Sequence, residues 1–195
     1  MRHPRALLLP LLLLLACSAA PAEGPTSRPA GGGEDVAQEE LLRRVAAIHG
    51  GAGPFAVAGY RMAEAALKQL GLAPGRFDIL VVHRSPAQVQ WSCVADGLQA
   101  ASGTSVGKLN LRWEETDGVV ESRIGTRDGS RVLVCRLRPS FLERYLDTPR
   151  ERLMAAGREV AGLPHGELFT LEPLAPPGEP GQPGEPGEGG AAEDR

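Results

Sequence analysis

The 195-residue chain has little of what three common classes of protein require. Its only cysteines are Cys17, Cys93 and Cys135, too few for a disulfide scaffold and not spaced as in a zinc finger. Its formal net charge is −3, so it lacks the basic excess of nucleic-acid-binding proteins. Its main apolar run, residues 6–16, is too short to cross a bilayer of about 30 Å as a helix. We therefore expect no nucleic-acid partner and no membrane-spanning helix.

That apolar run is instead typical of a cleaved signal peptide, which we predict over residues 1–16. Two arginines precede the run, and Ala16-Cys17 ends it in the lipobox pattern of a bacterial lipoprotein. Cys17 is thus the predicted lipidation site, and its diacylglycerol would anchor the protein to a membrane. Because Ser18 follows, we expect a periplasm-facing envelope protein at the outer rather than the inner membrane. The alternative is an ordinary signal peptide cut a few residues later.

Two low-complexity segments flank a single predicted domain. Residues 17–35 are rich in Ala, Pro, Gly and Ser, which predicts a flexible tether between lipid and domain. Residues 175–195 repeat Gly, Pro and Glu with a period of three, but the triplets are few, which favours a solvated, disordered tail over a collagen-like trimer. The remaining residues, 36–174, have the length of one domain.

Within residues 36–174 the pattern predicts an α+β domain. Apolar spacing with glycine and proline breakers predicts helices at 36–49, 55–70, 85–102, 140–146 and 148–162. Alternating or continuous apolar runs predict strands at 77–83, 110–115, 119–126, 131–137 and 167–174. A turn signal at 127–130 indicates a hairpin, so we expect a single mixed, largely antiparallel sheet packed with helices.

Two local signals refine these helices. The first predicted helix carries an apolar stripe that ends in Ile48. Thr148 and Glu151 have the spacing of a capping box, with proline at the first helical position between them.

Four side chains are candidate metal ligands. His49 ends a predicted helix at the glycine-rich segment 50–54, and His83 ends a buried strand. Cys93 and Asp96 lie three residues apart on one helical face. Zinc accepts sulfur, imidazole and carboxylate ligands, so these residues indicate a zinc-like site. The alternatives are a buried small thiol at Cys93 and a helix-terminal histidine at His49.

Lys108 is a candidate anion contact. The segment 103–108 is one residue short of a phosphate-binding loop, and Leu109 stands where the magnesium-binding hydroxyl would be. Nucleotide hydrolysis is therefore excluded, and Lys108 either holds an anionic group or is an ordinary surface lysine.

Two segments resemble the FmdE family, which is named after formylmethanofuran dehydrogenase. Residues 49–62 are similar to its opening pattern, His-Gly-His-x-Cys-Pro-Gly followed by Gly-Tyr-Arg-Met. Residues 92–111 are similar to its second pattern, Cys-x-x-Asp followed by Thr-Gly-x-x-x-Gly-Lys-x-Asn-Leu. The resemblance covers roughly residues 41–172.

The resemblance implies an α+β domain with a metal site, of which His49 and Cys93 occupy two ligand positions. Gly51 stands at the second histidine position and Gly53 at the first cysteine position. His83 is a substitute ligand in this interpretation. Nothing in the chain indicates molybdopterin binding, and an exported lipoprotein does not suit a cytoplasmic dehydrogenase.

Three hypotheses follow from these observations. The first is an envelope-anchored protein that binds a metal or small ligand, in a pocket built from the candidates above together with Gly51, Gly53, Asp96 and Lys108. The second is a non-catalytic interaction module with a degenerate site, whose partner is an envelope protein or a second copy. The third is an enzyme with Cys93 as nucleophile, which needs a histidine within about 3 Å of the sulfur.

Overall fold

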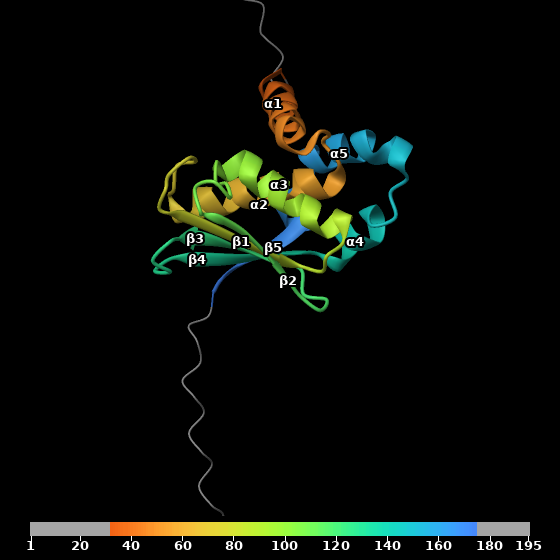
Figure 1. Cartoon of the computed structure of the whole chain (residues 1–195). Helices are drawn as coiled ribbons and strands as arrows, with labels where there is room; N and C mark the ends of the chain where they lie inside the picture. Colours follow the sequence, from red (N-terminus) through yellow and green to blue (C-terminus); the bar gives the residue numbers. More distant parts are fainter. Residues whose placement is uncertain (1–31, 175–195) are drawn as a thin grey trace, which may run out of the picture.

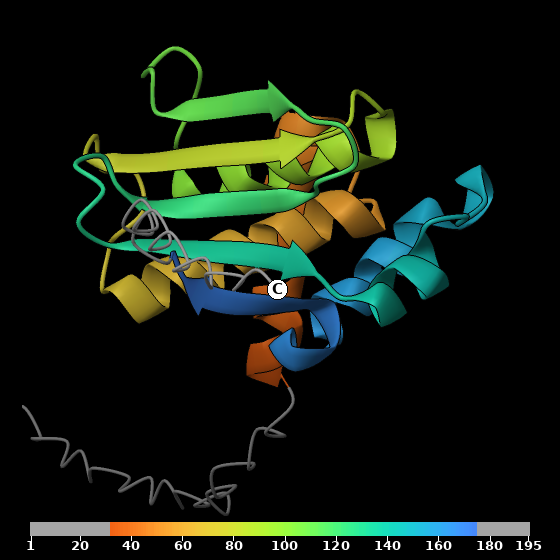
Figure 2. The same cartoon turned by 90° about the horizontal axis from the view of Figure 1, so that it is seen from below.

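A computed structural model describes residues 32–174, which form one five-stranded sheet with helices on one of its faces (Figures 1 and 2). The predicted α+β class is confirmed. The predicted signal peptide, Cys17, most of the tether and the tail 175–195 lie outside the described residues.

The sheet is mixed and mostly antiparallel, as predicted. Its strand order is β2-β1-β3-β4-β5, and only β1 and β2 run parallel. The strands are β1 (Ile79–Ser85), β2 (Leu111–Glu115), β3 (Glu121–Thr126), β4 (Val132–Leu137) and β5 (Phe169–Pro173).

The helices form two layers over one face of this sheet. Those next to the sheet are α2 and α3, and α1 and α5 pack against them (Figure 1). The helices are α1 (Gly32–His49), α2 (Pro54–Leu70), α3 (Val89–Ser102), α4 (Pro139–Tyr145), α5 (Leu153–Gly162) and α6 (His165–Leu168), with a 3₁₀ turn at Arg150–Arg152.

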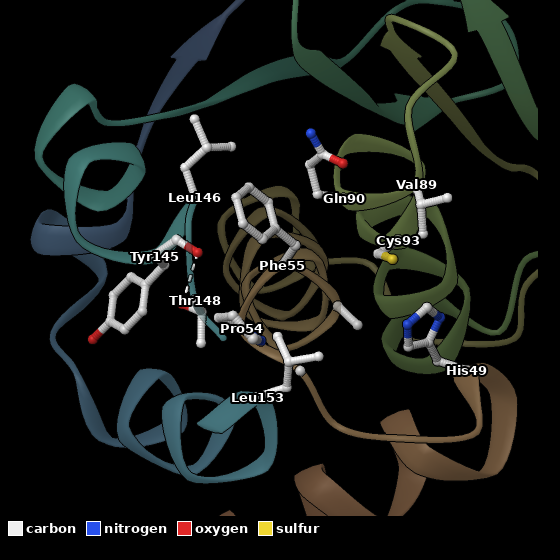
Figure 3. Close-up of a pocket in the computed structure, with 12 residues that line it drawn as sticks. His49, Pro54, Phe55, Val89, Gln90, Cys93, Tyr145, Leu146, Thr148 and Leu153 are labelled. Atoms are coloured by element: carbon white, nitrogen blue, oxygen red, sulfur yellow. Dashed lines mark hydrogen bonds between the residues drawn. The ribbon is translucent and has the colours of Figure 1, made fainter. Parts of the chain in front are cut away.

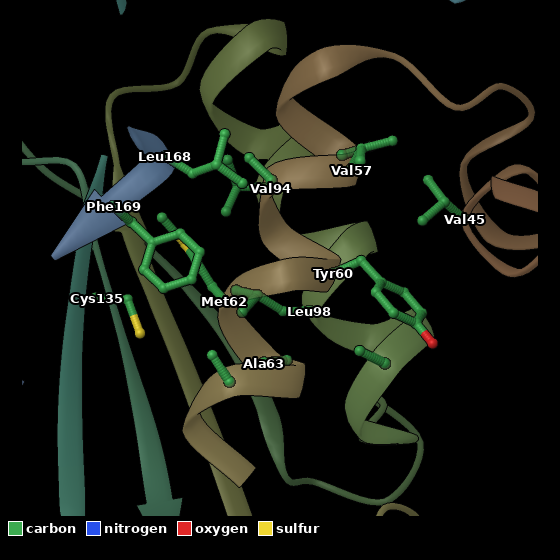
Figure 4. Close-up of a cluster of buried hydrophobic side chains, with 14 of the residues drawn as sticks. Val45, Val57, Tyr60, Met62, Ala63, Val94, Leu98, Cys135, Leu168 and Phe169 are labelled. Carbon is green, nitrogen blue, oxygen red and sulfur yellow. The ribbon is translucent and has the colours of Figure 1, made fainter. Parts of the chain in front are cut away.

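The core lies between α2 and the sheet. Met62 and Leu98 meet Phe169 and Cys135 there, and all four side chains are buried (Figure 4). The alanine-rich α2 approaches its neighbours closely because its side chains are short. It ends at Gly71, whose φ of 65° is the left-handed conformation that glycine adopts without strain, as the sequence predicted.

Two glycines bring the backbones of α2 and α3 into contact. A Cβ on Gly97 of α3 would lie 1.8 Å from the carbonyl oxygen of Ala56. A Cβ on Gly59 of α2 would lie 2.2 Å from that of Val94. Since neither distance can be relieved by moving a side chain, both positions require glycine. This crossing fixes where the first turns of α3 stand relative to α2.

Arg61, two residues after Gly59, fastens the end of α5 to α2. Its guanidinium donates hydrogen bonds to the carbonyl oxygens of Ala161 and Leu163, the latter at 3.1 Å. Carbonyl oxygens at the end of a helix have no hydrogen-bond donors within the helix, and the Arg61 side chain supplies the missing donors.

The uncovered face of the sheet carries an ion-pair cluster. Arg84, Arg123 and Arg136 surround Glu121 at 3.0, 2.8 and 2.8 Å. Burial alone would raise the pKa of Glu121, but these three guanidiniums together bring it below its ordinary value.

Some predicted boundaries are wrong. The first helix begins at Gly32 and so includes the end of the predicted tether, where Glu34 and Asp35 suit the positive end of a helix. Ile48 is 45% exposed and does not belong to the buried stripe.

Other differences have local causes. Ser85 ends β1 and is buried, so α3 begins at Val89 rather than at residue 85. Phe77 precedes its strand and is exposed. The predicted capping box does not form, because the Thr148 hydroxyl donates to the Tyr145 carbonyl at 2.8 Å instead.

Residues 32–174 contain two free thiols and no helix suited to cross a membrane. Cys93 and Cys135 are both free thiols, so they do not form a disulfide with each other. Within this range no helix has both the length and the apolar character needed to span a bilayer.

A candidate ligand pocket around His49 and Cys93

The candidate site is a cavity of about 290 Å³ at the start of α2 and α3. One wall is the first turns of α3, another is the beginning of α2, and the segment 145–153 closes the third side (Figure 3). The end of α1 adds His49 to the rim. Three parts of the chain that are distant in sequence, residues 49–56, 89–93 and 145–153, therefore meet here.

Close packing of α5 holds the third wall in place. A Cβ on Gly157 would lie 1.7 Å from the carbonyl oxygen of Ala52, so α5 touches the backbone of the glycine-rich segment 50–54. Arg61 fixes the far end of the same helix through its hydrogen bonds to the terminal carbonyls. The cavity is thus bounded by elements whose positions are set by backbone contact.

His49 is the histidine that the structure orients toward this cavity. Its Nδ1 lies 2.7 Å from Oδ2 of Asp96 on α3. A carboxylate can only accept a hydrogen bond, so Nδ1 carries a proton, and the neutral tautomer with this hydrogen bond has its lone pair on Nε2. The ring is 26% exposed and lines the cavity. His49 therefore offers one oriented nitrogen to a bound molecule or metal.

Cys93 places a thiol in the same cavity, one helical turn before Asp96. Its side chain is half-buried and lies on the α3 wall near His49 (Figure 3). Burial raises the pKa of the Cys93 thiol, and the charge of Asp96 raises it further. The group is consequently a neutral thiol at pH 7, which can donate a hydrogen bond but is a weak nucleophile.

The rest of the lining is mostly apolar. Phe55 forms the floor, held edge-on between Trp91 and Phe141 with ring centroids 5.4 Å apart in each pair. Val89, Leu146 and Leu153 complete the apolar wall. The polar groups left for a ligand gather on one side of the cavity, at His49, Cys93 and Gln90 (Figure 3).

His83 does not join this group. It is fully buried, with Nε2 2.9 Å from the carbonyl oxygen of Trp91 and Nδ1 2.9 Å from the hydroxyl of Ser122. Since a carbonyl only accepts, Nε2 carries the proton and Nδ1 accepts from Ser122. Burial lowers the pKa of His83, so the ring is neutral. Both nitrogens are engaged, and His83 ties the start of α3 to the sheet instead of facing the cavity.

The other predicted site residues are divided between the cavity and the rest of the surface. Gly53 lines the cavity, whereas Gly51 faces Met154, whose Sδ would lie 3.5 Å from a Cβ added there. Asp96 acts through His49. Lys108 lies on a different loop, where its Nζ donates to the Gly103 carbonyl at 2.8 Å. The single pocket predicted from sequence therefore does not include Lys108.

The donor set does not match a protein-built zinc site. Within residues 32–174 no three His, Cys, Asp or Glu side chains are grouped as metal ligands. His49 and Cys93 supply two donors, while zinc sites take about three or four from the protein. A metal at this position would need further ligands from a bound molecule.

The sequence did not reveal the apolar half of the pocket. Phe55 lies on α2, whereas Leu146 and Leu153 lie much later in the chain in the segment 145–153, and no periodicity in the sequence links the two parts. Pro149 marked the start of a helix near this wall but gave no sign that the wall faces Phe55.

Comparison with known proteins identifies one family. Residues 48–170 match the family described as "FmdE, Molybdenum formylmethanofuran dehydrogenase operon", which covers more than half of the chain. No curated protein was found to match.

Proposed function

We propose that this chain, which belongs to the FmdE family, binds a small and largely apolar molecule in the cavity beside His49 and Cys93. Its polar end would meet the His49 nitrogen and the Cys93 thiol, while its body contacts Phe55 and the leucines opposite. We further propose that Cys17 anchors the protein to the outer membrane, facing the periplasm. A role as a dehydrogenase is not part of this proposal.

The observation that carries the proposal is the orientation of His49 by Asp96. A carboxylate that fixes the tautomer and direction of an imidazole is a recurring device in binding and metal sites. Here it directs the free lone pair of Nε2 to a cavity with an apolar floor. Pockets for small molecules have this composition, with few polar groups at defined places, and volumes of roughly 300–1,000 Å³. The volume of about 290 Å³ is just below that range, so the cavity suits a small ligand.

A zinc-like metal is the second candidate, because an imidazole and a thiol face the same cavity. With two protein donors, the remaining coordination positions would belong to the bound molecule. The enzyme hypothesis has less support, since the raised pKa of Cys93 disfavours the thiolate that a nucleophile needs. If the chain is instead a non-catalytic interaction module, substitution of His49 should not change how it binds its protein partner.

Ligand screening by thermal shift tests the proposal. The wild-type chain is screened against small apolar molecules with one hydrogen-bonding end, with and without zinc chloride. A ligand at 100 times its dissociation constant adds about 2.7 kcal/mol to the unfolding free energy, which raises the melting temperature by several degrees. We expect His49→Gln and Cys93→Ser to remove that increase.

Matched variants separate binding from general stability. His165→Gln changes a histidine outside the cavity, and Cys135→Ala removes the other described thiol. Both should keep the ligand-dependent increase. If the His49 and Cys93 variants bind every hit as well as the wild type does, the proposed pocket is wrong.

The lipid anchor has its own test. Labelling with a fatty-acid analogue should mark the wild-type chain and not Cys17→Ser. An unlabelled wild-type protein that is nonetheless exported would leave the ordinary signal peptide as the correct interpretation.

A further inference from the structure

Three loops gather at the end of the molecule opposite the cavity. The cavity lies at the start of α2 and α3, and the loops 72–78 and 103–110 follow the ends of the same two helices (Figure 1). The hairpin turn 127–131 joins them. These loops expose large apolar side chains: Phe77 is 69% exposed, and Val106 and Leu109 are each 71% exposed.

Hydrogen bonds and a cation–π contact make these loops one surface. The Arg127 guanidinium donates to the carbonyl oxygens of Phe77 and Lys108, each at 3.3 Å. The Lys108 ammonium lies over the Phe77 ring, 5.4 Å from its centroid. The amide of Leu109 donates to the carbonyl of Val106 at 2.9 Å, which closes the turn between them. We call Phe77, Val106, Lys108, Leu109 and Arg127 the basic apolar tip.

Leu109 is held in an unfavourable backbone conformation. Its φ of 55° is in the left-handed region, and it is the single described non-glycine residue there. Its side chain is mostly exposed, so packing in the folded domain does little to offset that strain. Strain of this kind collects where a side chain is displayed for function.

The charge of this end differs from that of the whole chain. The three loops carry four basic residues, Arg76, Lys108, Arg127 and Arg131, against two acidic ones, while the chain has a net charge of −3. Lys108 also borders a hollow of about 410 Å³ with Arg43 and Arg44 of α1. The four basic and two acidic residues give these loops a net charge of +2, and an exposed apolar cluster with a net positive charge complements an anionic phospholipid surface.

We propose that the basic apolar tip docks on the anionic surface of a phospholipid bilayer. Phe77, Val106 and Leu109 enter the boundary between headgroups and acyl chains, and Lys108 and Arg127 contact lipid phosphates. This orientation turns the cavity, at the other end of α2 and α3, away from the membrane. The proposal rests on the lipid anchor of the proposed function for its location, but not for its binding chemistry.

The anchor by itself would not choose which side of the domain faces the membrane. Residues 18–31 could span up to about 48 Å if fully extended. A compact domain of this size has a radius of gyration of roughly 15 Å. The tether is long enough for any side to reach the bilayer, so the surface chemistry of the domain decides.

Vesicle sedimentation of an unlipidated chain tests the docking. The probe is residues 17–195 with Cys17→Ser, mixed with phosphatidylcholine vesicles that contain either no anionic lipid or about 30% phosphatidylglycerol. We expect binding to the anionic vesicles, and weaker binding as salt screens the charges. Replacing Phe77, Val106 and Leu109 by serine should lower the partition coefficient at least about tenfold. Lys108→Gln with Arg127→Gln should lower it by about tenfold as well.

Val36→Ser with Met154→Ser is the matched control, because those side chains are 69% and 57% exposed and neither lines the cavity nor belongs to the tip. The control should bind vesicles as the wild type does. The proposal is overturned if the wild type does not bind anionic vesicles, or if the control loses as much binding as the tip variants. Capture of an envelope protein by the tip without vesicle binding would also overturn it. Because the probe lacks lipid and pocket ligand, failure here leaves the lipid-anchor and pocket tests unaffected.

The variant Leu109→Gly tests whether the Leu109 side chain serves membrane binding or the stability of the fold. Glycine adopts the left-handed conformation without strain, so the melting temperature should not fall. Vesicle binding should nevertheless decrease several-fold, because one inserted side chain is gone. A variant that melts lower and binds vesicles unchanged would show that Leu109 serves the fold instead.

Discussion

The α2–α3 crossing and two walls of the candidate cavity come from the same two sequence motifs, but their glycines differ in how closely they are packed. At the crossing, Gly59 and Gly97 meet carbonyl oxygens of the opposite helix, and no Cβ fits. Beside the cavity, a Cβ on Gly53 would have nothing within 4 Å, and one on Gly51 would meet only a flexible methionine sulfur at 3.5 Å. Neither of those two has a positive φ.

This difference indicates that the fold does not depend on which residues stand at the positions where the family resemblance implies donors. The packing residues of the motifs are fixed by backbone contact. The positions of Gly51 and Gly53 are sterically free, so the packing does not require glycine there. The helices that cross at Gly59 and Gly97, with the sheet that they cover, form a frame that substitutions beside the cavity should leave intact.

The largest predicted effect breaks the crossing. Gly97→Ala should lower the unfolding free energy by more than about 3 kcal/mol, since its Cβ would overlap the backbone of Ala56. Gly53→Ala should cost no more than about 1 kcal/mol, because its Cβ meets nothing and the change affects only the N-cap of α2. Urea unfolding of both variants measures the difference. Equal losses would remove the distinction between frame and cavity.

The next largest effect is expected on zinc affinity, when metal-binding side chains are introduced at Gly51 and Gly53. The double variant Gly51→His, Gly53→Cys supplies the histidine and cysteine that the family resemblance implies. Gly53 lines the cavity with His49 and Cys93, and Gly51 lies two residues before it. We expect zinc affinity to rise by at least on the order of 100-fold, because the site would reach the ligand number zinc prefers. Competition with a zinc chelator measures it. Gly51→Ala, Gly53→Ala is the control that tests backbone effects alone, and a double variant with unchanged affinity would show that these positions do not converge.

His83 should behave as part of the frame. Its pKa is lowered by burial in the folded state, so the unfolded chain binds the proton more readily. Stability contributed by the neutral ring is present above the ordinary pKa of 6.5 and is lost as the pH falls below it. The loss should reach up to about 1.4 kcal/mol per pH unit.

Unfolding free energies of wild type and His83→Gln between pH 7 and pH 5 check this slope. The variant should start less stable and show a shallower decline. A decline as steep as that of the wild type would assign the pH dependence to another group.

A small effect on stability is predicted for the polar pair beside the cavity. Asp96→Ala should cost less than about 1 kcal/mol, because the His49–Asp96 pair is partly exposed. It should nonetheless shift the His49 proton from Nδ1 toward Nε2. Long-range proton–nitrogen NMR of the imidazole reads the tautomer directly. An unchanged tautomer in the variant would show that Asp96 does not orient His49.

The sequence predicted the frame well because local signals specify it. The end of α2 at Gly71 and the buried face of α3 with Val94 and Leu98 follow from helical spacing and one glycine. The start of α3 could not be predicted, since Ser85 is drawn into β1 by pairing with a distant strand.

The site was predicted only in part, because contacts between residues distant in sequence decide which side chains reach the cavity. His49, Cys93 and Asp96 were named from their residue types, and the structure brings these three together. From their residue types alone, His83 and Lys108 are equally plausible site residues. In the folded domain His83 instead forms hydrogen bonds with Ser122 and Trp91, and Lys108 lies at the opposite end of α3.

The central claim is that the cavity holds a small molecule at His49 and Cys93 and is not a closed zinc site. Native mass spectrometry of the protein purified from its own envelope tests this most directly. We predict a bound organic molecule that is lost in His49→Gln, with zinc present only in complexes that also contain that molecule. Stoichiometric zinc without any organic molecule, retained in His49→Gln, would contradict the account.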